Sequence, residues 1–393
     1  MHELKMNILK KLGMPLVGVL TAAISITLVL CGNPGNMGFC IACFLRDTAG
    51  AVGLHRAALV QYVRPEIIGI IFGSFIVSLV KKEFQPKGGS APLTRFVLGF
   101  ALMIGALIFL GCPLRMALRI AGGDLNAVVG LFGFVVGILI GIFFLNKGYS
   151  LKRSYDVSKT DALMTPISTL ILFGILIIVP SVLFFSDEGP GSMHAPLVIS
   201  LIAGLVMGGV GFISRLCFVG GIRDSILLKS FSMLSAFIAL IVAGIIGNLI
   251  FGKFNLGFEG QPIAHTDGLW NFLGMTLVGL CSVILSGCPI KQLILAGSGN
   301  SDSAVTVLGM VAGAAFAHNF SMASSAAGVT GNGKIGFTVA AVVVIFIAVY
   351  NTFIKCRVNK GSSGLNENEP ITENEVIQTN EIIPENEAMS ENE

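Results

Sequence analysis

Charged side chains are scarce in this chain. Lys, Arg, Asp and Glu make up 12% of its 393 residues, whereas soluble domains carry roughly 25%. Hydrophobic residues reach 54%, and the mean hydropathy is +0.85. This composition excludes an ordinary soluble domain and indicates an integral membrane protein.

Several familiar functional patterns are also missing. The chain has no Walker A motif, so we expect no nucleotide hydrolysis of its own. Residues 331–336 spell the dinucleotide fingerprint but follow no strand, so we interpret them as a loop. His55, His265 and His318 lack metal-ligand spacing and are interpreted as ordinary polar contacts. We therefore expect no cofactor, no metal, no nucleic-acid partner and no enzymatic activity.

Apolar stretches recur along the chain, each long enough or nearly long enough to cross a bilayer, which takes about 17 to 25 helical residues. No small-x-small cleavage site follows the first stretch, so we interpret it as a span rather than as a signal peptide. The ten stretches lie near residues 14–31, 65–80, 93–111, 126–145, 166–185, 196–214, 231–251, 269–287, 303–320 and 335–355.

Two cysteine-containing strings occur twice. The string 38–47, GFCIACFLRD, is matched by 215–224, RLCFVGGIRD, which places Cys217 177 positions after Cys40. A Gly-Cys-Pro motif around Cys112 returns 176 positions later around Cys288. The chain is therefore an internal duplication, and duplication in an apolar chain is typical of transporters whose substrate site lies between the halves.

Five spans in each half predict two repeats of inverted topology, over residues 12–185 and 196–355. With the N-terminus inside, the loops on that side carry 18 of the 25 Lys and Arg residues and the other side carries seven. The positive-inside rule then places both termini in the cytoplasm. Residues 361–393 contain nine Glu and no Lys or Arg, which predicts a disordered acidic cytoplasmic tail. The expected fold class is an all-α membrane protein.

Four segments near the repeated cysteines are helix-sized but too short to span: 41–51, 113–121, 218–228 and 289–297. We interpret them as re-entrant half-helices, which usually line a permeation path. Proline suits the first helical position, so the Gly-Cys-Pro motifs predict that Cys112 and Cys288 are N-cap residues. The alternative is that each motif is only a tight helix break with a small buried thiol.

Charged and polar residues accompany these segments. Arg115 and Lys291 follow the Gly-Cys-Pro cysteines by three positions and add positive charge where a helix N-terminus already attracts anions. Intramembrane charges are usually paired, so we interpret two adjacent pairs as internal ion pairs that hold the half-helices. The pairs are Arg46 with Asp47 and Arg223 with Asp224, and Asp124 and Asn300 are expected to cap the spans that follow.

The remaining cysteines are weaker candidates. Cys43 aligns with Gly220 and Cys281 with Gly105, so neither belongs to the duplicated set. Cys31 lies near a span end and Cys356 in the basic flank of the last span. Cys40-x-x-Cys43 matches a thioredoxin-like redox motif, but no βαβ pattern surrounds it.

The longer strings resemble a known family. GNPGNMGFCIACFLRD at 32–47, His-Arg at 55–56, YVRPE at 62–66 and the twin Gly-Cys-Pro motifs resemble the YeeE/YedE family of sulfur-transport membrane proteins. They look most like the YedE branch, which is proposed to move selenium. The similarity covers about residues 12–355.

The resemblance implies uptake of a small sulfur- or selenium-containing anion, which is thiosulfate in the better understood branch. Such an anion is handed along cysteine thiols by S–H hydrogen bonds. Carried over to this sequence, the substrate path would be Cys40, Cys112, Cys217 and Cys288, the first two nearer the outside and the last two nearer the cytoplasm. A cytoplasmic sulfur-carrier protein is an open partner.

Two further hypotheses stay open. A membrane thiol-disulfide redox protein would depend on Cys40 and Cys43 and not on the Gly-Cys-Pro cysteines. A non-transporting membrane scaffold would tolerate replacement of every cysteine.

Overall fold

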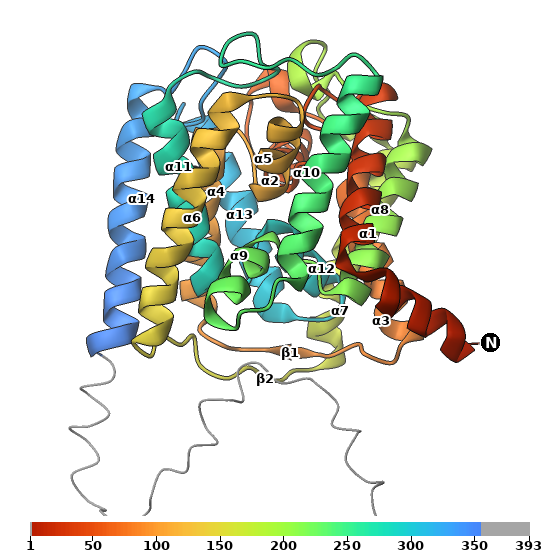
Figure 1. Ribbon diagram of the computed structural model, residues 1–393, viewed down its shortest axis with the longest axis vertical. Helices are drawn as coiled ribbons and strands as arrows, with labels where there is room; N and C mark the ends of the chain where they lie inside the picture. Colours follow the sequence, from red (N-terminus) through yellow and green to blue (C-terminus); the bar gives the residue numbers. More distant parts are fainter. Residues whose placement is uncertain (1, 355–393) are drawn as a thin grey trace, which may run out of the picture.

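In the part of the chain that the structure describes, the fold is all-α apart from one pair of two-residue strands, as the composition predicts. The computed structural model describes residues 2–354, and within them ten helices have at least 16 residues (Figure 1). These long helices are α1 (His2–Leu30), α3 (Pro65–Val80), α4 (Pro92–Phe109), α6 (Leu125–Asn146), α7 (Lys159–Ile178), α8 (Leu197–Ser214), α10 (Ser232–Ile250), α11 (Gly268–Ile284), α13 (Ser301–Asn319) and α14 (Gly331–Val349).

Short elements connect the long helices. Strands β1 (Lys87–Gly88) and β2 (Tyr155–Asp156) pair antiparallel, with Lys87 opposite Asp156. The four short α-helices occur where half-helices are predicted: α2 (Ile41–Ala51), α5 (Pro113–Ala121), α9 (Phe218–Leu227) and α12 (Pro289–Gly297). The 3-10 turns are η1 (Ala58–Val60), η2 (Pro180–Val182) and η3 (Gly189–Gly191), and the π-turn η4 (Tyr350–Ile354) extends α14.

Nine segments of the described chain are long and apolar enough to cross a membrane. The tenth long helix, α13, is not among them, because Asp302, His318 and several small polar residues lower its hydropathy. Much of α13 is buried and packs against α4, α2 and α12. A helix enclosed by protein needs a less apolar surface than one that faces lipid.

Two sequence expectations are wrong in detail. The span near 166–185 is α7, which begins at Lys159 and ends at Ile178, because Pro180 lacks the backbone N–H that would continue it. Residues 331–336 are not a loop but the first turns of α14. The side chain of Thr330 accepts a hydrogen bond from the backbone N–H of Gly333 at 2.9 Å and caps that helix.

The long helices pair across the two halves of the sequence. The four most extensive contacts join α6 with α11, α4 with α13, α3 with α8, and α1 with α10. The 176–177-residue offset maps α6 onto α13 and α4 onto α11. It therefore maps the contact of α6 with α11 onto the contact of α13 with α4. The same offset brings α3 onto part of α10 and α1 onto part of α8, so the contact of α3 with α8 corresponds to that of α10 with α1. The contacts therefore follow the duplication.

Duplicated glycines lie at two of these equivalent interfaces. A Cβ at Gly133 or Gly137 of α6 would overlap the carbonyl oxygens of Phe272 and Thr276 in α11. A Cβ at Gly309 or Gly313 of α13 would likewise come too close to the carbonyl oxygens of Phe96 and Phe100 in α4. Small residues let helices approach closely in a membrane, so each repeat uses one pair of glycines for the same contact.

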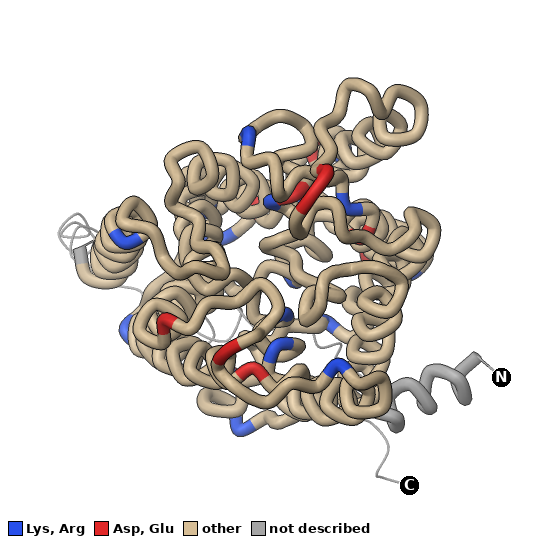
Figure 2. Tube along the Cα trace, turned by 90° about the horizontal axis from the view of Figure 1, so that it is seen from above, with Lys and Arg blue, Asp and Glu red and all other residues tan. Residues whose placement is uncertain are grey.

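Both ends of the described chain lie on one face of the helix assembly. Figure 1 shows α1 beginning and α14 ending at the lower face, where β1 and β2 also lie. The predicted tail, 361–393, falls outside the described residues, and the repeat boundaries remain predictions. Seen from above, several Lys and Arg positions lie within the ring of helices (Figure 2).

Candidate functional site

All four duplicated cysteines are N-cap residues of the short helices. Cys112 and Cys288 precede the prolines that begin α5 and α12, which confirms the prediction from Gly-Cys-Pro. The sequence analysis did not assign Cys40 and Cys217 as caps, yet they cap α2 and α9. The signal was their position directly before the amphipathic segments 41–51 and 218–228.

The caps at Cys40 and Cys217 are closed by hydrogen bonds. The sulfur of Cys40 accepts the backbone N–H of Cys43 at 3.3 Å, and the sulfur of Cys217 accepts that of Gly220 at 3.3 Å. Ser, Thr, Asp and Asn are the usual N-cap residues. Cysteine at all four short helices therefore points to a requirement other than helix stability.

The N-termini of α2 and α5 meet at a group of thiols. Cys40 contacts both Cys43 and Cys112 through their sulfurs, and all three side chains are buried. Arg115 donates from Nη1 to the sulfur of Cys43 at 3.4 Å. We call Cys40, Cys43, Cys112 and Arg115 the first-repeat thiol cluster.

The N-termini of α9 and α12 meet in the corresponding way. The sulfurs of Cys217 and Cys288 contact each other, and Lys291 lies close enough to act on Cys217 electrostatically. The two thiols are buried and Lys291 is half-buried. We call Cys217, Cys288 and Lys291 the second-repeat thiol pair.

The four short helices form one connected group inside the protein. Besides the two thiol contacts, α2 packs against α12 and α5 packs against α9. In Figure 1, α2 and α5 lie in the upper half and α9 and α12 in the lower half, nearer the face where the chain ends. That the four thiols form a single path through the membrane remains a prediction.

Arg115 is a buried cation held by neutral groups. Its guanidinium donates to the carbonyl oxygens of Leu110, Ile263 at 3.1 Å and Asn36 at 3.3 Å, in addition to Cys43. Within residues 13–353, whose side chains the structure describes, no carboxylate lies within ion-pair distance of it. A buried charge without a counter-ion is costly, so Arg115 leaves a positive potential beside the thiols.

The two Arg-Asp motifs are internal ion pairs, as predicted, but their surroundings differ. Arg46 contacts Asp47 at 2.6 Å, and Arg64, which the sequence analysis did not single out, contacts the other oxygen of Asp47 at 2.8 Å. These three side chains are almost fully buried, whereas those of Arg223 and Asp224, 2.7 Å apart, are 19% and 24% exposed. The α2 half-helix is therefore anchored in the interior and the α9 half-helix is not.

A second buried ion pair supports α5. Arg119, also missed by the sequence analysis, contacts Asp124 at 2.6 Å and stacks over the ring of Phe109 at 4.2 Å. Asp124 in turn caps α6 by accepting the backbone N–H of Asn126 at 2.9 Å, and Asn300 caps α13, both as predicted. A single carboxylate thus joins a half-helix to the span that follows it.

Two of the three histidines interpreted as polar contacts do contact the backbone, but the interpretation is wrong for His318, whose buried Nε2 has no hydrogen-bond partner and whose ring stacks on that of His55. His55 lies 3.0 Å from the carbonyl oxygen of Arg46, and His265 lies 2.8 Å from that of Ile108. Both belong to loops, and burial lowers the pKa of each imidazole. Both rings are therefore neutral at neutral pH, and the positive charge near the thiols comes from Arg115 and Lys291.

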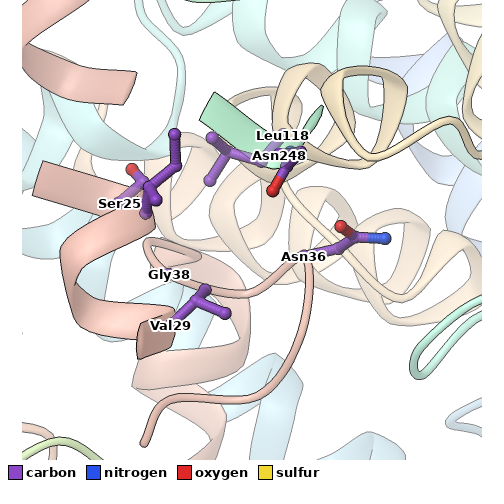
Figure 3. A pocket seen from close by; sticks show the side chains of 7 residues that line it. Ser25, Val29, Asn36, Gly38, Leu118 and Asn248 are labelled. Carbon is purple, nitrogen blue, oxygen red and sulfur yellow. The ribbon is translucent and has the colours of Figure 1, made fainter. Parts of the chain in front are cut away.

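Two cavities lie beside the loops that contain Asn36 and His265. One of about 20 Å³ lies between α1, α5 and α10 and is lined by Gly38, Asn36 and Leu118, among others (Figure 3). Its volume suits about one water molecule. A larger cavity of about 210 Å³ is lined by His265, Thr266, Asp267 and residues 326–329.

The other cysteines lie outside the duplicated set. Cys281 is buried in α11, Cys31 is half-buried just after α1, and Cys356 falls outside the described residues. Cys43 is different, because the structure places it in the first-repeat thiol cluster. All seven described cysteines are free thiols.

The model of a family described as sulphur transport matches residues 213–378, a range that contains the second-repeat thiol pair. No curated protein matches the chain.

Proposed function

Since the model of a sulphur-transport family matches residues 213–378, we propose that the chain is a member of that family and a permease for a small sulfur- or selenium-containing anion. The proposed substrates are thiosulfate or a selenium compound of similar chemistry. The anion would pass Cys40, Cys112, Cys217 and Cys288 across a bacterial inner membrane. The observation that carries the proposal is that these four cysteines cap four internal half-helices and meet in two pairs, each beside a basic residue.

The electrostatics of this arrangement favour an anion. Each helix N-terminus presents unpaired N–H groups and about half a positive charge, and Arg115 adds a full charge without a carboxylate partner among the described side chains. Lys291 supplies the corresponding charge at the second-repeat thiol pair. A cation would be repelled from both positions.

The thiols suit passage rather than tight binding. A neutral thiol is a weak hydrogen-bond donor that costs little to bury, and its polarizable sulfur matches a sulfur or selenium atom better than an oxygen. Weak contacts at successive sites let an ion enter and also leave. The proposed mechanism has no covalent step, so no catalytic residue is assigned.

The order of the two thiol groups across the membrane follows from the proposed orientation. With 18 of 25 basic residues on the side of the termini, the termini would lie in the cytoplasm. The first-repeat thiol cluster would then be nearer the outside and the second-repeat thiol pair nearer the cytoplasm. By family resemblance, a cytoplasmic sulfur-carrier protein would receive the anion.

Uptake of labelled thiosulfate and selenite, in cells that lack their own routes for both, tests this function. We expect the parental chain to support uptake of at least one, and the quadruple Cys→Ala variant at Cys40, Cys112, Cys217 and Cys288 to lose it. A matched variant with Cys31 and Cys281 replaced by Ala should transport normally. If the quadruple variant transports at the parental rate with equal membrane levels, the thiol path is wrong.

The redox hypothesis retains one supporting observation. Cys40 and Cys43 lie one helical turn apart at a helix N-terminus, with the Cys43 N–H bonded to the Cys40 sulfur, as in dithiol redox motifs. That function requires Cys40 and Cys43 and tolerates loss of Cys112 and Cys288. Uptake is therefore compared for two double Cys→Ala variants, one at Cys40 and Cys43 and one at Cys112 and Cys288. Loss of uptake in the variant at Cys112 and Cys288 would contradict the redox hypothesis.

A further inference from the structure

The two thiol groups differ in the number of thiols and in the basic residue beside them. When the strings are aligned by their 177-residue offset, Cys40 corresponds to Cys217, but Cys43 corresponds to Gly220. The first-repeat thiol cluster therefore has three sulfurs and a guanidinium, and the second-repeat thiol pair has two sulfurs and an amine. Because the chain is duplicated, the second-repeat thiol pair serves as the reference for the first-repeat thiol cluster within the same molecule.

Cys43 occupies a central position in its cluster. It lies in the first turn of α2, is completely buried, and contacts the sulfur of Cys40 on one side. On its other side, Nη1 of Arg115 donates to its sulfur at 3.4 Å. The side chain thus bridges the buried cation and the cysteine that caps α2.

The position of Cys43 limits the hydrogen bonds that Arg115 can donate to a substrate. The N–H groups of Arg115 are already directed at backbone carbonyls and at the Cys43 sulfur. An oxyanion that requires direct guanidinium bonds would have to displace these contacts. A sulfur or selenium atom can be met by the polarizable thiols while the charge of Arg115 acts over a longer range.

We infer that Cys43 is a specificity-determining residue, which makes the first-repeat thiol cluster select anions that end in sulfur or selenium over all-oxygen anions of the same shape. The inference rests on the proposed transport function. It gives the two repeats different tasks: the cluster with three thiols selects, and the pair with two thiols passes the ion on. Thiosulfate and sulfate, which differ by one sulfur in place of an oxygen, are the natural test pair.

The test measures how well unlabelled sulfate and unlabelled thiosulfate each compete with uptake of labelled thiosulfate. Cys43→Ala should lower the preference for thiosulfate over sulfate by about five- to tenfold, the effect of losing roughly one hydrogen bond. Cys43→Gly, which reproduces the residue at Gly220, should act in the same direction. Cys281→Ala removes a thiol that is equally buried but outside the cluster, and should leave the preference unchanged.

Two variants at residue 43 protect the test against a folding defect, and membrane levels are matched throughout. If both keep the parental preference, or if thiosulfate and sulfate lose affinity by the same factor, the assignment of Cys43 is wrong. That outcome leaves the transport function intact. If the parental chain takes up neither thiosulfate nor selenite, the transport function itself fails.

Discussion

At the scale of single residues, the most informative choice is cysteine as a helix cap. A thiol satisfies backbone N–H groups less well than a hydroxyl or carboxylate does, so four cysteine caps lower helix stability slightly. They place four polarizable sulfurs at four positive helix ends. Cys→Ser variants keep a side chain that can cap the helix but remove the sulfur, so they test whether the substrate requires sulfur at these positions.

Cys112→Ala and Cys288→Ala should each abolish uptake while leaving the protein folded. Neither thiol makes a cap hydrogen bond, and deleting one small buried group costs less than the roughly 2 to 5 kcal/mol of Leu→Ala. Cys→Ser retains a donor but loses the soft sulfur, so it should also impair uptake. Full activity of the Ser variants, at equal membrane levels, would show that softness does not matter.

Arg115→Gln tests the buried cation. Gln keeps hydrogen-bonding capacity toward the carbonyls of Asn36 and Ile263 but removes the charge, so uptake should fall by about ten- to a hundredfold, the range for one charge-assisted contact. Arg115→Lys, which keeps the charge, should recover part of this loss. Equal activity of the Gln and Lys variants would argue against an electrostatic role.

At the scale of helices, the two halves use the same Arg-Asp motif with different burial. Asp47 is completely buried between Arg46 and Arg64, whereas the Arg223–Asp224 pair is partly exposed to solvent. Removing one partner of a buried pair leaves an uncompensated charge, which typically costs about 3–5 kcal/mol. An exposed pair contributes about 0–1 kcal/mol.

Asp47→Asn should therefore destabilise the protein strongly, and Asp224→Asn should have little effect. Thermal unfolding in detergent, followed by the loss of the monodisperse protein peak, provides the measurement. The duplication supplies the control, since both variants change an Asp that follows an Arg in a half-helix. Equal shifts in melting temperature would contradict the assignment of α2 as the anchored half-helix.

Close helix packing gives a second prediction at this scale. Gly137→Leu should separate α6 from α11, because even a Cβ would overlap the carbonyl oxygen of Thr276. Overpacking typically costs about 1–3 kcal/mol, and more where backbone must move. Gly174→Leu on α7, where a Cβ meets nothing within 4 Å, should be neutral. Folded protein recovered from membranes is compared for the two variants.

At the scale of the whole molecule, the first and last described helices begin and end on the same face. The positive-inside rule predicts that this face lies in the cytoplasm. Reporter fusions at Leu4 and Gly361 should both report a cytoplasmic location. Two periplasmic signals would reverse the orientation, and one of each would rule out an even number of crossings.

Local sequence patterns were sufficient for the elements themselves. Apolar length placed nearly all the spans, and the prolines at 113 and 289 placed α5 and α12, because proline favours the first helical position wherever it occurs. The errors at α7 and at residues 331–336 arose where a local signal, Pro180 or the Thr330 cap, was given too little weight. The sequence also indicated the four duplicated cysteines and the two Arg-Asp pairs, since repetition marks residues that both copies retain.

The tertiary structure alone decided which of these groups meet. Cys43 and Arg64 have no counterpart in the repeat pattern, and only the packing of α2 against its neighbours brings Cys43 to Arg115 and Arg64 to Asp47. The difference in burial between the two Arg-Asp pairs is likewise invisible in the Arg-Asp motifs themselves. Hydrophobic periodicity and composition predict the secondary structure of each segment. Burial and charge pairing depend instead on contacts between residues far apart in the chain. The sequence by itself therefore determined the class, the helices and the repeated thiols, and the fold determined their surroundings.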